Sequence, residues 1–208
     1  MNKELLLISA LIAISCLQIS AQTTPYFQQT VDHNIHVQLN DVDHELDAEI
    51  WTQYVNNSPD ELDYLWYHVW PNAYSSAKSA LAKQQFREGD LFLFYAMARD
   101  LGGMDGLDFK INGEAARWEF HNTHPDIVKV YLNTPLQPGE SIEINTPFQV
   151  RIPSGKISRL GHIGQSYQIT QWYPKPAVYD RDGWHEMPYL DQGEFYSEFG
   201  TFDVHITL

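Results

Sequence analysis

The stretch VDHNIHVQL, residues 31–39, alternates apolar and polar side chains along its whole length, with His33 at one of the apolar positions. Successive side chains of an extended strand point to opposite faces, so this pattern predicts a strand with one buried and one solvent-facing side. The alternation continues in ELDAEIWTQYV, residues 45–55, and a more apolar version follows in LDYLWYHVW, residues 62–70. These three segments indicate a fold built from β-strands.

Later segments extend this pattern. Turn residues separate further short strand candidates at intervals of about 8–12 residues, which is typical of all-β domains. Within residues 107–120, Asn112-Gly113 predicts a hairpin with a tight primed turn. The other strand candidates are residues 90–98, a pair of strands turning near Pro138-Gly139 in residues 126–152, residues 165–173 and residues 201–208.

One segment differs from the rest. SSAKSALAKQQF, residues 75–86, predicts a short helix with Ser75 or Ser76 as its N-cap. We therefore expect a single all-β domain, in which mostly antiparallel sheets form a saddle-like or sandwich assembly with one short helix.

The first 21 residues have the pattern of a secretory signal peptide. A short charged start precedes an apolar run from Leu5 to Ile19, and small residues end at Ala21. The run is too short for a membrane span. We expect cleavage near Ala21, a secreted or periplasmic location, and a mature domain of residues 22–208 that lacks cysteine, because Cys16 lies in the leader.

The formal net charge of the chain is -14. Such an acidic surface repels phosphate backbones and anionic lipids, so we expect neither a nucleic acid nor a membrane as partner.

The histidines supply no metal motif. A zinc peptidase helix needs His-Glu-x-x-His, and the segments that begin correctly at His44 and His185 both lack the second histidine. His121 and His124 lie in a turn and have no third partner in the sequence. We assign no catalytic residue, no metal ligand and no cofactor to this chain.

Residues 171–200, which we call the aromatic segment, carry eight aromatic rings, six carboxylates and two cationic side chains. The segment has no strand or helix period. Two interpretations follow from its composition: a rigid cover pinned by its rings, or an acidic rim around a cationic ligand.

The motifs TQWYPKPAVYD (170–180), GEFYSEFG (193–200) and FDVHITL (202–208) resemble the N-terminal β domain of aminopeptidase N-type zinc metallopeptidases, in particular their secreted bacterial members. LDYLWYHVWPNAY (62–74) and LQPGESIEINTPFQVRIP (136–153) are similar to the same domain. The resemblance implies a saddle of β-sheets that packs on a thermolysin-like catalytic domain, on the same or a separate chain. That domain would hold the zinc and the catalytic groups and act on peptide substrates, and this chain alone would hydrolyse nothing.

The chain ends at Leu208 within an alternating apolar run. Domains rarely stop inside a strand, and in relatives the catalytic domain would begin just beyond this point. We therefore expect the chain to be truncated before that domain.

The resemblance also implies substrate-binding residues. Relatives have a Thr-Gln-x-Glu segment at the mouth of the active site, and Gln171 matches its glutamine. Tyr173 replaces the glutamate, and Glu194 or Glu198 would supply the lost charge. The substrate-binding candidates are therefore Gln171, Tyr173 and Glu194, although Gln171 also fits an ordinary strand position.

Two alternatives remain from other functional classes. One is a free-standing secreted β-sandwich module that binds a glycan through Trp172 and Trp184, or binds a protein partner. The other is an interaction protein that docks on a separate catalytic chain.

Overall fold

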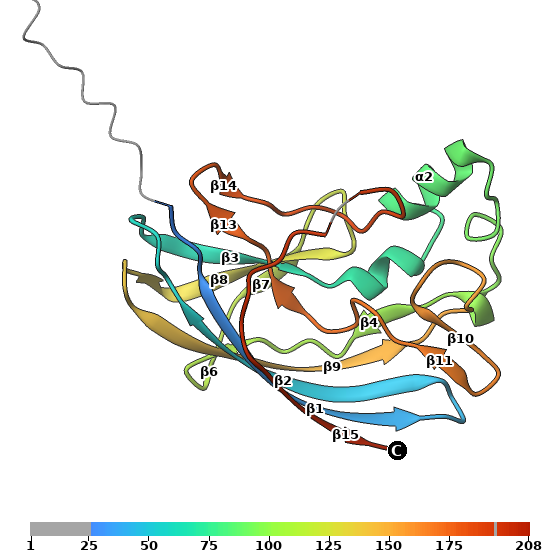
Figure 1. Cartoon of the computed structure of the whole chain (residues 1–208), viewed down its shortest axis with the longest axis horizontal. Helices are drawn as coiled ribbons and strands as arrows, with labels where there is room; N and C mark the ends of the chain where they lie inside the picture. The colour runs from blue at the N-terminus through green and yellow to red at the C-terminus, as the bar shows by residue number, and fades with distance from the viewer. Residues whose placement is uncertain (1–25, 194) are drawn as a thin grey trace, which may run out of the picture.

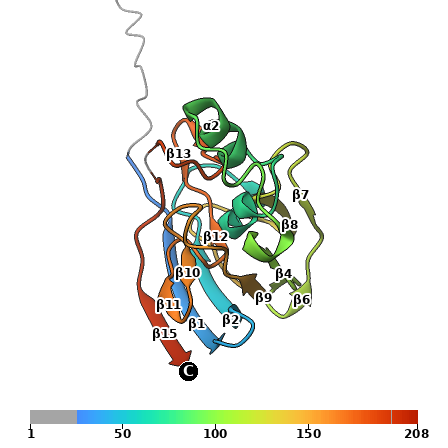
Figure 2. The ribbon, with the colours of Figure 1, turned by 90° about the vertical axis from the view of Figure 1, so that its right-hand side faces the viewer.

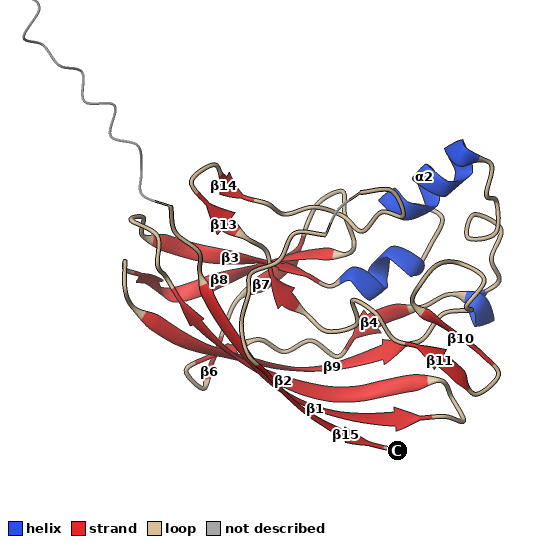
Figure 3. Cartoon of the chain, viewed as in Figure 1, coloured by secondary structure: helices blue, strands red, loops and turns tan. Residues whose placement is uncertain are grey.

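The computed structural model describes residues 26–193 and 195–208 (Figure 1). The expected leader, Cys16 and the candidate Glu194 lie outside the described residues. Strands dominate the described chain, as Figure 3 shows, and most of their pairings are antiparallel. Within these residues, no helix is both long and apolar enough to cross a membrane.

The larger sheet has seven strands in the order β15-β1-β2-β9-β5-β6, with β4 also paired to β9. Its strands are β1 (Thr30–Asn40), β2 (Glu45–Val55), β4 (Gly103–Asp105), β5 (Lys110–Ile111), β6 (Glu114–Ala115), β9 (Ser141–Arg151) and β15 (Phe202–Thr207). The register of β1 on β2 runs without a bulge from Thr30 opposite Val55 to Asn40 opposite Glu45.

The smaller sheet has four strands in the order β12-β3-β8-β7. They are β3 (Leu62–His68), β7 (Trp118–Phe120), β8 (Ile127–Leu136) and β12 (Lys175–Pro176). Two separate hairpins complete the strands, β10 (Gly161–Ile163) with β11 (Ser166–Gln168) and β13 (Tyr179–Asp180) with β14 (Gly183–Trp184).

The main hydrophobic core lies between the two sheets. Ile35, Ile50 and Tyr54 of the larger sheet and Leu65 and Val128 of the smaller sheet are at most 1% exposed and belong to one cluster. The alternation of residues 31–39 and 45–55 places Ile35, Ile50 and Tyr54 inward, because every second residue of a strand shares a face. The expected all-β fold with mostly antiparallel sheets is confirmed.

A second, smaller core lies beside the helical part of the chain. It packs the 3-10 helix η1 (Trp70–Tyr74) and α2 (Ala80–Glu88) against Tyr189 of the aromatic segment. In Figure 2, α2 lies at one end of the molecule, away from the paired strands β15, β1 and β2. The expected helix exists, but its N-cap is Ser79, whose Oγ accepts the N–H of Ala82 at 3.1 Å. The prediction of Ser75 or Ser76 as the cap is wrong.

The apolar run at residues 90–98 is not a strand. The Asp90 carboxylate accepts the N–H of Phe92 at 2.9 Å, and the chain continues in turns to the 3-10 helix η2 (Ala98–Asp100). An aspartate that bonds the backbone two residues ahead favours a turn over an extended strand.

Two expected pairings also differ from the structure. The turn at Asn112-Gly113 has positive φ at both residues, as predicted, and it joins β5 to β6. The second expected arm, β7, pairs instead with β8 in the other sheet. Similarly, β8 and β9 flank the turn near Pro138-Gly139 but belong to different sheets. The sequence pattern identifies strands, whereas the choice of partner depends on tertiary packing.

The last strand, β15, pairs in parallel with β1, from His33 opposite Phe202 to Gln38 opposite Thr207. The backbone just before β15 packs closely on β1, because a Cβ on Gly200 would lie 1.7 Å from the carbonyl oxygen of Val31. Of the expected strand at residues 165–173, only β11 forms, and Gln171 interrupts the extended backbone with a φ of 53°.

Candidate functional site

The side chain of Gln171 is directed to a buried lysine. Lys175 Nζ donates to Gln171 Oε1 at 2.6 Å and to Ser197 Oγ at 2.9 Å, and lies 4.1 Å from the centre of the Trp70 ring. Since the amide oxygen of Gln171 is occupied, its NH2 group is the part left to donate to a ligand. No local sequence pattern indicates that Lys175 holds Gln171 in place.

Lys175 is 5% exposed and has no carboxylate within ion-pairing distance among the described residues. Burial lowers the pKa of Lys175 to about 7, because the charged ammonium loses its hydration. His68 lies directly opposite on β3, and burial together with the charge of Lys175 lowers the pKa of His68 to about 3. Lys175 and His68 therefore lose their protons at a lower pH than the same side chains do in water.

Tyr173 contacts different residues. Its ring packs edge-on against His33 at 5.4 Å and Phe202 at 5.8 Å between centroids, and burial raises the pKa of its phenol to about 12. Tyr173 and Gln171 thus share no contact partner among these interactions. Glu198 is half-buried, and burial raises the pKa of its carboxyl to about 7.

The aromatic segment is pinned by its rings. Trp184 lies 4.9 Å from Tyr179 and 6.0 Å from Tyr64 between ring centres, while Trp172 lies 5.9 Å from Phe148. The carboxylate of Asp180 accepts hydrogen bonds within the segment, from Tyr196 and the backbone of Asp182, and pairs with His185 at 2.8 Å. These contacts favour the interpretation as a ring-pinned cover over that as an acidic rim.

An apolar hollow of about 460 Å³ lies beside this segment. It is lined by Val37, Leu39 and Leu46 of the sheet, Ile169 and Trp172 on either side of Gln171, and Val204, Ile206 and Leu208 at the end of the chain. Val204 is 41% exposed and Ile206 is 68% exposed, although both lie on the face of the sheet that elsewhere forms the core.

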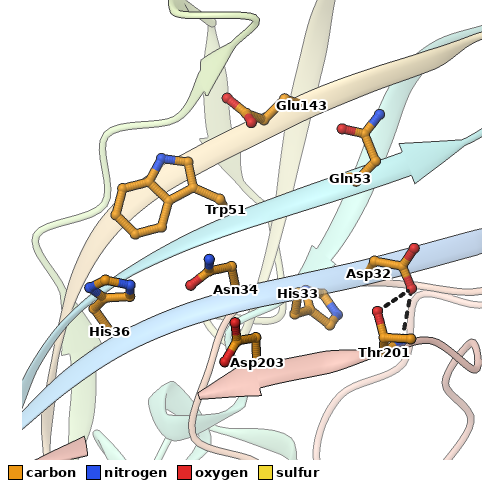
Figure 4. A pocket seen from close by; sticks show the side chains of 9 residues that line it. All are labelled: Asp32, His33, Asn34, His36, Trp51, Gln53, Glu143, Thr201 and Asp203. Carbon is orange, nitrogen blue, oxygen red and sulfur yellow. Dashed lines mark hydrogen bonds between the residues drawn. The ribbon is translucent and has the colours of Figure 1, made fainter. Parts of the chain in front are cut away.

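A second hollow, a shallow trough of about 590 Å³, lies on the opposite face of the same sheet (Figure 4). Trp51 of β2 lies in it, among polar side chains of β1, β9 and β15. Trp51 was missed as a candidate, although the alternation of residues 45–55 places it on the polar face, where a tryptophan is unusual.

The histidines of interest lie in separate places. His44 stacks on His162 at 3.7 Å between ring centres, and His121 stacks on His124 at 5.0 Å. Among residues 26–193 and 195–208, no three histidine, cysteine or carboxylate side chains are placed to hold a metal ion. This part of the chain therefore offers no ligand set for the zinc that the sequence resemblance implies for a full-length protein.

No family model and no curated protein matches this chain. Among solved structures, it is similar to an M1 zinc metallopeptidase from Deinococcus radiodurans, with 14% identity and a TM-score of 0.38 over 60% of this chain and 21% of that one. Yeast LTA4 hydrolase in complex with bestatin gives 9% identity and a TM-score of 0.32 over 66% and 18% of the two chains.

A putative nutrient binding protein from Legionella pneumophila gives 8% identity and a TM-score of 0.35 over 60% and 40% of the two chains. The chain thus spans about a fifth of the length of the two zinc-peptidase and hydrolase structures. All three TM-scores are below 0.5, so these similarities assign no function to this chain.

Proposed function

We propose that this chain is the N-terminal, non-catalytic β domain of a secreted zinc metallopeptidase of the aminopeptidase type. It packs on a catalytic domain that holds the zinc, and it forms one wall of the peptide-binding cleft. The sequence resemblance of residues 170–208 suggests this family, and the apolar hollow beside Gln171 is the observation that carries the proposal.

The hollow fits a domain that packs on another protein surface. Fully burying an aliphatic side chain such as Ile206 contributes about 1.5–3 kcal/mol, and this contribution is lost while the side chain faces water. Contiguous exposed apolar surface is typical of protein interfaces. Ile169 and Trp172, on either side of Gln171, line the hollow. A domain that covers the hollow would therefore lie beside Gln171.

Gln171 then acts through its amide NH2 group, since Lys175 occupies its oxygen. An NH2 donor suits a peptide carbonyl better than it suits a free amino terminus, which is itself a donor. Tyr173 stays a substrate-binding candidate in this proposal, although its ring is packed between His33 and Phe202.

The first test is the size and activity of the native polypeptide. An antibody raised against residues 26–193 should capture, from the exported fraction, a chain several times larger than the 24.0 kDa of this sequence. The captured protein should cleave aminopeptidase substrates, and a zinc chelator should abolish that activity. A native chain no larger than 24.0 kDa, with no peptidase bound to it, would contradict the proposal.

A pair of variants of the native protein tests the hollow itself. Ile206→Asp places a charge on the apolar face of β15, whereas Thr207→Asp places the same charge on the opposite face of the same strand. We expect Ile206→Asp to reduce peptidase activity and thermal stability strongly and Thr207→Asp to leave both nearly unchanged. Equal effects of the two variants would show that the hollow is not a domain interface.

A further inference from the structure

The trough of Figure 4 is built from three strand-to-strand rows on the outward face of the larger sheet. In the central row, Asp203 of β15, Asn34 of β1 and Trp51 of β2 lie side by side. A neighbouring row places Gln53 of β2 opposite Glu143 of β9. Adjacent strands lie about 4.8 Å apart, so the four strands give a surface about 14 Å wide.

Trp51 is the aromatic platform of this trough. Its ring is half-buried, and His36 meets it edge-on at 5.5 Å between ring centres. His205 of β15 lies 4.5 Å from His36 and extends the row of rings across three strands. The neighbouring rings limit the movement of the indole, so a flat apolar surface is already formed for a ligand.

Several polar groups around this ring are free to bind a ligand. The side chains of Asn34, Gln53 and Glu143 make no hydrogen bond with any other residue that the structure describes, and Asn34, Gln53 and Glu143 are exposed. By contrast, Asp32 is occupied, because it accepts the N–H and the hydroxyl of Thr201 at 2.8 Å each. Figure 4 shows these two bonds at one end of the trough.

The free groups offer both donors and acceptors. The amides of Asn34 and Gln53 donate and accept, and the carboxylate of Glu143 accepts. Asp203 adds an acceptor, although one of its oxygens lies 3.3 Å from His205 Nε2. A cationic ligand would use acceptors alone, whereas a chain of hydroxyl groups uses both kinds. Among the residues that the structure describes, no lysine or arginine lines the trough, whereas the carboxylates of Asp32, Glu143 and Asp203 do, so an acidic ligand would be repelled.

We propose that this trough binds a neutral saccharide, with one sugar ring on the face of Trp51 and its hydroxyl groups on Asn34, Gln53 and Glu143. Packing of an aromatic ring on apolar C–H groups combined with a few placed polar groups is how ligand sites achieve orientation. The width of the surface fits an oligosaccharide better than a single sugar. The site does not use Trp172 or Trp184, and it lies on the opposite face from the apolar hollow, so it is independent of the proposed peptidase role.

Calorimetry on the mature chain tests this site. The probes are four neutral hexasaccharides, made of β-linked glucose, xylose, mannose or N-acetylglucosamine. We expect at least one to bind with a Kd below about 1 mM. Trp51→Ala should weaken that binding by at least about tenfold. The matched control, Trp184→Ala, removes a tryptophan from another surface and should bind as the unmodified chain does.

Gln53→Ala provides a second variant, because Gln53 is exposed and its removal leaves the core intact. We expect it to weaken binding about threefold to tenfold, the loss typical of one hydrogen bond. Its control is Gln149→Ala, on the outward face of β9 outside the trough. The proposal fails if none of the four saccharides binds, if Trp51→Ala binds as tightly as the unmodified chain, or if a tetra-arginine peptide displaces the saccharide.

Discussion

The two-sheet core and the aromatic segment, residues 171–200, are held in place by different forces. The core relies on long strands in continuous register and on apolar side chains that are almost fully buried. The aromatic segment has only two-residue strands and depends on single contacts, such as Trp70 Nε1 donating to the carbonyl of Met187 and Asp126 accepting the N–H of Tyr189. Two of the residues that hold the segment, Asp126 and Lys175, are buried and titratable. The comparison therefore predicts a core insensitive to pH and a segment whose stability changes with pH.

The largest expected effect is in the core. Ile50→Ala removes a side chain that is 1% exposed between the two sheets, and a large-to-small change of this kind costs about 2–5 kcal/mol. Chemical denaturation should show this loss of unfolding free energy, nearly equal at pH 6 and pH 9. Ile163→Ala, at a position 71% exposed, is the control and should cost less than about 0.5 kcal/mol.

The next effect is the pH dependence contributed by Lys175. Its pKa is about 7 in the folded chain and near 10.5 when unfolded, so between these values the unfolded state binds more protons. The stability that Lys175 contributes therefore rises with pH across this window, by up to about 1.4 kcal/mol per pH unit, and is lost as the pH falls towards 7.

Lys175→Met keeps a similar shape but cannot titrate. Denaturation between pH 7.5 and pH 9.5 should show a smaller increase in stability with pH for this variant than for the unmodified chain. Lys110→Met, at a position whose side chain is 44% exposed, should leave the slope as it is. Identical slopes for Lys175→Met and the unmodified chain would mean that the buried amine does not control this region.

The smallest effect concerns the helix beside the aromatic segment. Ser79→Ala removes the side chain that caps α2 and should lower the unfolding free energy by about 1 kcal/mol. Ser76→Ala tests the cap expected from sequence and should cost clearly less. A larger loss for Ser76→Ala would overturn the assignment of the cap.

The strands of the core could be predicted because alternation is a local signal. Residues 31–39 and 45–55 identify β1 and β2 and the inward side chains of both, including His33. Their neighbours could not be predicted in the same way. The strand β15 pairs in parallel with β1, which is distant in the chain, whereas β8 and β9 are close in the chain but belong to different sheets. No local pattern encodes either arrangement.

The candidate site was only partly predictable. Gln171 was found through a resemblance, but its positive φ and its bond to Lys175 depend on the packing of Trp70 and Ser197 around it. From sequence alone, a lysine between two prolines would be expected on the surface, because only the fold buries the amine of Lys175. Trp51, in contrast, could have been noticed from alternation alone.

The parallel pairing of β1 and β15 has a mechanical consequence. Tension applied between Phe27 and Leu208 would pull β1 towards its first residue and β15 towards its last, so the two strands would slide along each other. All the hydrogen bonds between His33–Gln38 and Phe202–Thr207 would then share the load at once, instead of opening one after another. The last strand would thus act as a clamp against stretching of the chain, although its side chains are exposed.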